Sequence, residues 1–101
     1  MNALIPLNDA QWAGQNASYT GTAGATTGWP TGPEYVLVMV TTDAYVRVGA
    51  GVTATTADTL LPAFTPAIFK VPPVQANSAW RVSAIQLASG GTVYAKPLTG
   101  Q

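Results

Sequence analysis

The sequence predicts an all-β protein: a small antiparallel β-sandwich, of the jelly-roll or immunoglobulin-like kind, preceded by an extended N-terminal arm. Three observations carry this prediction. The fourteen Thr and ten Val are β-branched, which suits pleated sheet better than helix. Eight prolines spread along the 101 residues leave few windows long enough for a helix. From Glu34 onward, short apolar segments alternate with turn residues at the spacing of a small sandwich or barrel.

The composition changes sharply near residue 34. Residues 1–34 contain no Val, Lys or Arg and are rich in Gly, Ala, Thr, Ser and Asn, whereas all the valines and basic residues lie further on. We therefore expect two parts, an extended arm or loop over residues 1–34 and a β-sandwich domain over residues 35–101. A segment of this length without regular structure is unusual inside a compact domain, so the arm is expected to lie against another surface.

Five strands are clear in the sequence, and the Thr/Ala-rich segment 52–61 is the place for a doubtful edge strand. The clear strands are expected at residues 35–41, 44–49, 67–71, 80–87 and 92–97. The first of them is a continuous apolar run, which predicts burial on both faces. Thr42-Asp43 predicts a hairpin between the first two strands, although Thr-Asp is not a favoured turn pair. Ser89-Gly90-Gly91 predicts a second hairpin, between the last two strands.

Residues that carry chemistry are scarce. Charged residues make up 8% of the chain, which is about a third of the usual fraction, and the net charge is zero. The absence of cysteine and histidine excludes a disulfide framework, a thiol nucleophile, a Cys/His zinc site and a Ser-His-Asp triad. The acids are Asp9, Glu34, Asp43 and Asp58, and no two of them are close in sequence. Asp43 and Asp58 lie in expected turns, so turn formation fits better than paired-carboxylate catalysis or a calcium site. We expect no enzyme activity, no catalytic residue, no cofactor and no metal.

The charge pattern does not favour nucleic acid or a membrane as a partner. Four basic residues balanced by four acids give no field that would gather phosphates. The basic residues fall one to a strand beside aromatic residues. Such an arrangement can bind single-stranded nucleic acid by stacking, but it also fits a sheet face that is solvated or lies in an interface. No apolar run approaches the roughly 20 residues that span a bilayer. A net charge near zero instead favours association between molecules.

The apolar residues of the arm are the candidate interface. They are sparse, and they comprise Leu4, Ile5, Trp12, Tyr19 and Trp29. A large aromatic side chain buries about 150–250 Å² when it packs, so these residues are expected to be covered. Three interpretations stay open. The arm folds back on the sandwich of its own subunit, it anchors on a neighbour, or tryptophans such as Trp12, Trp29 or Trp80 form a platform on which sugars stack.

Residues 38–98 resemble small structural proteins of tailed bacteriophages. The matching segments, in order, are Val-Thr-Thr-Asp-Ala-Tyr-Val-Arg-Val-Gly at 40–49, the loop at 53–58, Leu-Pro-Ala at 61–63, Ile-Phe-Lys-Val-Pro at 68–72, Arg-Val-Ser-Ala-Ile-Gln at 81–86 and Gly-Gly-Thr-Val-Tyr-Ala at 90–95. Within that group the chain looks most like capsid decoration, or cement, proteins. The likeness leaves out residues 1–34.

The resemblance implies a structural virion protein on the capsid surface, assembled in the host cytoplasm. Its expected partners are the major capsid protein and further copies of itself in a homotrimer, with no direct contact to nucleic acid or membrane. The arm lies outside the likeness, and we expect it to lie along the major capsid protein or an adjacent subunit, with Leu4, Ile5, Trp12 and Trp29 as plugs. Deleting residues 2–30 is expected to leave a folded sandwich that no longer binds capsids. A tail, neck or baseplate component is an alternative of the same kind, and a carbohydrate-binding module is one of a different class.

Overall fold

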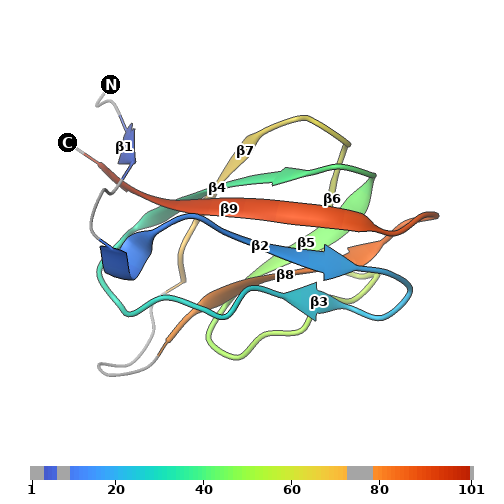
Figure 1. Cartoon of the computed structure of the whole chain (residues 1–101), viewed down its shortest axis with the longest axis horizontal. Coiled ribbons are helices and arrows are strands. Elements are labelled where there is room, and N and C mark those ends of the chain that lie inside the picture. Colours follow the sequence, from blue (N-terminus) through green and yellow to red (C-terminus); the bar gives the residue numbers. More distant parts are fainter. Residues whose placement is uncertain (1–3, 7–9, 73–78, 101) are drawn as a thin grey trace.

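The computed structural model describes residues 4–6, 10–72 and 79–100, and these form a β-sandwich (Figure 1). One layer, sheet A, contains β1 (Leu4–Pro6), β2 (Gln15–Tyr19), β4 (Tyr35–Val40), β7 (Ala67–Lys70) and β9 (Gly91–Gly100). The other layer, sheet B, contains β3 (Gly24–Ala25), β5 (Ala44–Gly49), β6 (Thr59–Leu61) and β8 (Arg81–Gln86). A short 3₁₀ helix, η1 (Ala10–Trp12), precedes β2. Within these residues no helix is long and apolar enough to cross a bilayer.

The strand pairs are antiparallel and nested. β2 pairs with β9, β3 with β8, β4 with β7 and β5 with β6. The chain is therefore one long antiparallel ribbon, folded at the β5–β6 connection and wrapped so that β4 also meets β9 and β5 also meets β8. β1 continues the same edge of β9 that β2 occupies, with Leu4 opposite Gly100. This nested pairing in two sheets is the connectivity of a jelly roll, so the predicted sandwich is confirmed and the jelly-roll form of it applies.

The two hairpins expected from the sequence are connections between the sheets instead. β4 and β5 lie in different sheets, and so do β8 and β9. The Leu87 N–H donates to the Asp43 carbonyl oxygen at 3.1 Å, which ties the two connections to each other. The prediction was wrong because apolar strands close in sequence satisfy a hairpin pattern and a sheet-to-sheet connection equally well. Thr-Asp, which lacks the glycine of the favoured two-residue turns, was the local sign against a hairpin.

The core draws on both parts of the sequence. Its largest buried side chains are Trp29, Trp80, Tyr19, Val36, Val38, Val40, Val46, Val82 and Val93. Residues 15–29 thus belong to the sandwich, and the boundary expected at residue 34 does not separate an arm from a domain. The physical reason is that β9 and β8 each have an edge that β2 and β3 pair with. The composition change marks the step from the outer strands β2 and β3, which contain no Val, to the central strands β4, β5, β8 and β9, which do.

β4 is buried on one face only. Val36, Val38 and Val40 point into the core and are fully buried, whereas Leu37 and Met39 between them are partly exposed. The expectation of burial on both faces was wrong, because sheet B covers only the inner side of sheet A. The outer side of β4 is therefore apolar and open to solvent.

Candidate binding face

Two of the acidic residues that the structure describes serve the fold. Asp43 Oδ1 accepts the Ala63 N–H at 2.8 Å, and Asp58 Oδ2 accepts the Thr55 N–H at 2.7 Å. The Asp58 contact confirms the turn-forming role predicted for that carboxylate, whereas Asp43 ties its connection to the loop that follows β6, 20 residues further on. Asp9 lies outside the described residues, and within them no group of three or more acids, histidines or cysteines could hold a metal ion.

Two of the predicted interface residues lie inside the core of their own chain. Tyr19 is 2% exposed, and its hydroxyl donates to the Thr42 carbonyl oxygen at 2.8 Å. Trp29 is 0% exposed, and its Nε1 donates to the Ala13 carbonyl oxygen at 2.8 Å. Neither side chain can reach a neighbouring molecule. For these two aromatics the structure follows the interpretation in which the N-terminal region folds back on its own subunit.

The other predicted interface residues lie at one end of the sandwich. Trp12 is partly buried against the core, and its Nε1 donates to the Pro30 carbonyl oxygen at 3.2 Å. Leu4 and Ile5 belong to β1, whose backbone pairs with the last residues of β9. Trp80, the remaining residue of the sugar-platform interpretation, is 1% exposed. The structure therefore does not gather the tryptophans into a common exposed surface.

Part of the outer face of sheet B is covered by the segment that joins β5 to β6. The Ala54 N–H donates to Ser83 Oγ at 2.9 Å, and Arg81 Nε donates to the Val52 carbonyl oxygen at 2.9 Å. Ser83 lies between the core residues of β8 and so faces outward, yet it is only 1% exposed. This segment closes that region of sheet B to a partner.

Sheet A presents a more open outer surface in the part of the chain that the structure describes. We call its exposed and half-exposed apolar residues the apolar face: Leu37, Met39, Pro66, Ile68 and Tyr94. The register explains how they gather, because Met39 lies opposite Tyr94 and Leu37 lies opposite Ile68. Ile68 is 53% exposed and Tyr94 is 45% exposed. Side chains from three strands and the adjoining Pro66 thus form one continuous apolar surface.

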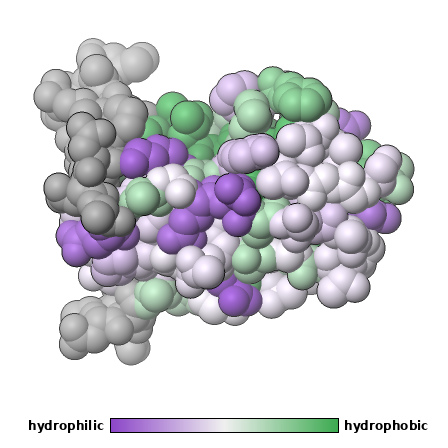
Figure 2. Space-filling view, viewed as in Figure 1, coloured by the Kyte–Doolittle hydropathy of each residue, from purple (hydrophilic) through white to green (hydrophobic). Residues whose placement is uncertain are grey.

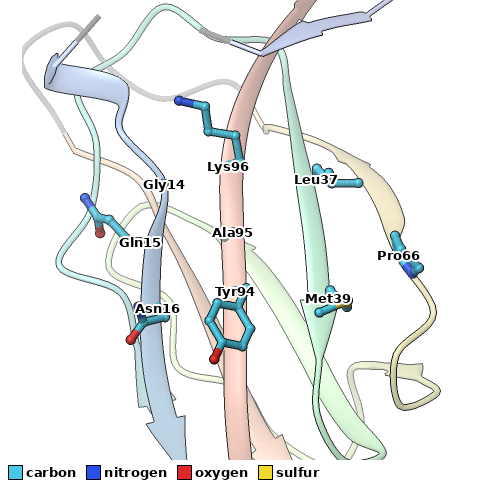
Figure 3. Close-up of a pocket in the computed structure, with 9 residues that line it drawn as sticks. All are labelled: Gly14, Gln15, Asn16, Leu37, Met39, Pro66, Tyr94, Ala95 and Lys96. Atoms are coloured by element: carbon cyan, nitrogen blue, oxygen red, sulfur yellow. The ribbon is translucent and has the colours of Figure 1, made fainter. Parts of the chain in front are cut away.

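A hollow of about 370 Å³ lies in the apolar face (Figure 3). Leu37, Met39, Pro66 and Tyr94 supply its apolar lining, and the side chains of β2 and Lys96 border it on the polar side. Gln15 on that side is held by the fold, since its amide nitrogen donates to the Gly28 carbonyl oxygen at 2.9 Å. The hollow is therefore a mostly apolar depression with a polar border.

Phe64 projects from the loop that connects β6 to β7, which we call the Phe64 loop (residues 62–66). Its side chain is 66% exposed, the largest value among the exposed large apolar residues of the described chain. Its φ of 56° lies in the left-handed region, where bulky side chains are rare. Figure 2 shows apolar residues gathered along the upper edge of the molecule, where Figure 1 places β7 and the loop before it.

The sequence analysis did not select the apolar face or Phe64. Leu37 and Met39 were hidden in a run with no polar residue to mark its outer side. For Phe64 a signal was present, namely an aromatic residue between Pro62 and Pro66 in a segment with no strand pattern. Comparison of the chain with protein-family models, with curated proteins and with solved structures finds no match. The jelly-roll fold is therefore assigned from the strand order alone, and the candidate site from the exposure and arrangement of its residues.

Proposed function

We propose that this protein is a structural virion protein that binds the outer shell of a phage capsid and stabilises the contacts between capsomers. The observation that carries the proposal is the open apolar face of sheet A. Such a surface serves adhesion, and adhesion needs no catalytic group, cofactor or metal. The phage-like order of segments in residues 38–98 supplies the partner, the major capsid protein.

The jelly-roll connectivity is compatible with this role. Jelly rolls occur in viral capsid domains and in lectins, so the fold supports a virion protein by analogy and does not assign one. The lectin-like alternative has less support here, because Trp29 and Trp80 pack in the core and cannot stack on a sugar. A tail, neck or baseplate component would use the apolar face equally well.

The surface that we assign to assembly differs from the one expected from the sequence. Tyr19 and Trp29 are unavailable, so the apolar face, including Ile68, takes over the role of the plugs. Exposed apolar surface of this kind marks sites of protein–protein contact. Homotrimers on the capsid surface, assembled in the host cytoplasm, remain the proposed form.

The size of the apolar face indicates a weak individual contact. Three strands spaced about 4.8 Å apart, with residues rising about 3.4 Å each along the six residues of β4, give it roughly 300 Å². A standard interface buries about 800 Å² on each partner, so this face supplies less than half of one. Many such contacts around a closed shell act together, and the linked contacts hold far more strongly than one alone.

The proposal is tested by binding to capsids. Purified particles stripped of this protein are mixed with the wild-type chain, with Ile68→Asp or with Leu87→Asp, and the bound fraction is measured after sedimentation. Ile68 and Leu87 are 53% and 47% exposed, but only Ile68 belongs to the apolar face, so Leu87→Asp is the matched control. We expect the wild type and the control to pellet with the shell and Ile68→Asp to remain in solution.

The copy number per virion separates shell from tail. Mass spectrometry of intact virions is expected to show a number that matches the capsomers of the shell. A number that matches a single tail or neck ring would replace decoration with the tail alternative. Absence of the protein from virions, or equal pelleting of all three chains, would overturn the proposal.

A further inference from the structure

We propose that Phe64 of one copy of this chain occupies the hollow in the apolar face of a second copy. This inference rests on the proposal that the protein is an assembling subunit, and it names the contact between copies. Phe64 acts as a knob on one side of the contact, and Leu37, Met39, Pro66 and Tyr94 form the receiving hollow on the other.

The loop that carries Phe64 is fixed by hydrogen bonds to neighbouring connections. The Phe64 N–H donates to the Val40 carbonyl oxygen at 2.7 Å, and the Ala63 N–H donates to Asp43 Oδ1 at 2.8 Å. Pro62 and Pro66 restrict the backbone on either side. An aromatic side chain on a fixed backbone loses little further freedom when it binds, so more of its contact energy remains as affinity.

The backbone of Phe64 adopts a conformation that is unfavourable for its bulky side chain. Its φ of 56° suits glycine or asparagine, whereas a bulky residue there is unfavourable. The side chain makes little use of its own subunit, because 66% of it is exposed. Strained residues of this kind gather at sites of binding and catalysis. Strain and exposure at one residue together point to a contact outside the subunit.

The hollow offers the chemistry that an aromatic side chain needs. Met39 supplies a flexible thioether that packs well on aromatic rings, and Tyr94 supplies a ring for edge or offset stacking. Phe64 does not line the hollow of its own chain, although Pro66, two residues further on, does. The Phe64 side chain therefore leaves the hollow of its own chain empty and is exposed for contact with the hollow of another copy.

A second copy suits the hollow better than a charged partner. No carboxylate lines it, and the chain has zero net charge, so copies approach one another without long-range repulsion. The apolar face supplies less than half of a standard interface, and a Phe that packs adds about 150–250 Å². Knob and hollow are different surfaces, so the contact is head-to-tail, and a contact of this type forms a ring when the rotation between copies closes and a filament when it does not.

The experiment is a complementation measured by analytical ultracentrifugation of the full chain. Phe64→Gly removes the knob and keeps the hollow, while Met39→Glu keeps the knob and places a charge in the hollow. We expect the wild type to form an oligomer, each variant alone to be monomeric, and an equimolar mixture of the two to form one-to-one dimers. The mixture restores one intact contact, because one partner brings the knob and the other brings the hollow.

Controls separate a lost contact from a lost fold. Glycine adopts the left-handed conformation without steric cost, so Phe64→Gly is expected to keep its circular dichroism and cooperative unfolding. Tyr94→Asp replaces Met39→Glu if the latter does not fold, and Leu87→Asp, outside the apolar face, is expected to remain oligomeric. A monomeric wild type at every concentration, an oligomeric Phe64→Gly, or a mixture of folded variants that stays monomeric would overturn the inference.

Binding to capsids is measured separately on the same variants. A folded, monomeric Phe64→Gly that still pellets with the shell supports the contact between copies and leaves the proposed function in place. The opposite result is a wild type that is oligomeric, a Phe64→Gly variant that is monomeric, and no pelleting of either with any particle. That result would overturn the proposed function and retain this inference.

Discussion

Trp29 and Trp80 are paired through both their side chains and their backbones. Their ring centroids lie 4.7 Å apart at an interplanar angle of 36°. The Trp29 N–H donates to the Trp80 carbonyl oxygen at 2.8 Å, and the Trp80 N–H donates to the Trp29 carbonyl oxygen at 3.0 Å. The pair fastens the Gly/Thr-rich N-terminal region to the strand that begins at Arg81. It converts a segment expected to reach a neighbour into part of the subunit's own core.

Trp29→Ala is expected to destabilise the protein strongly. The substitution leaves a cavity beside Trp80, and truncation of a buried Trp costs about 3–5 kcal/mol. Urea unfolding followed by circular dichroism measures the change. Trp12→Ala is the matched control, since Trp12 is only partly buried, and it is expected to cost less. Equal losses for the two variants would contradict the central place of Trp29 in the core.

Deletion of residues 2–30 is expected to prevent folding. The deletion removes β2, β3 and Trp29, so it opens one edge of β9 and one edge of β8 and exposes Trp80. The amide region of a proton NMR spectrum should lose the dispersion of a folded β protein. A well-dispersed spectrum from the truncated chain would instead support the prediction from the sequence that residues 1–34 form an arm separate from the sandwich.

Gly24→Ala is expected to destabilise the sandwich by about 1–3 kcal/mol through overpacking. A Cβ at this position would collide with the Ser18 carbonyl oxygen, because β2 and β3 approach closely there. Gly21→Ala is the control, since its Cβ would meet the Gln86 side chain at an ordinary 3.7 Å. Chemical unfolding of the two variants tests the difference, and equal stability would contradict the close approach of the two strands.

Phe64→Gly is expected to be more stable than Phe64→Ala by about 1 kcal/mol. Both variants lose the aromatic side chain, but only alanine keeps the Cβ that makes the left-handed backbone costly. Thermal unfolding under conditions where both are monomeric gives the comparison. If alanine were as stable as glycine, the backbone at this position would not be strained, and one support for the knob would be lost.

The positions of the strands in residues 35–98 were predictable because the signals are local. The β-branched runs and the prolines and glycines between them place the bounds of β4, β5, β7 and β8 within one residue of the structure, and those of β9 within three, because β9 runs on to Gly100. The turn role of Asp58 follows from equally local chemistry, since its carboxylate binds the backbone N–H of Thr55 within the same turn. Asp43 instead binds the Ala63 N–H in a loop 20 residues away, which is a tertiary contact.

The pairing of the strands was not predictable in the same way. β2 and β3 contain few strongly β-forming residues, and they become strands because β9 and β8 offer hydrogen-bonding edges that are distant in sequence. The connections at residues 41–43 and 87–90 cross between sheets, and a pattern of apolar segments carries no information about which sheet follows.

By itself, the sequence determined that the chain is a β protein, where its central strands lie, and that Cys, His and paired-acid chemistry are lacking. Only the tertiary structure decided that Trp29 is core, that Leu37 and Met39 face solvent, and that Phe64 projects beside an apolar hollow. The reason is that strand formation depends on neighbouring residues, whereas burial depends on which segments pack together from opposite ends of the chain.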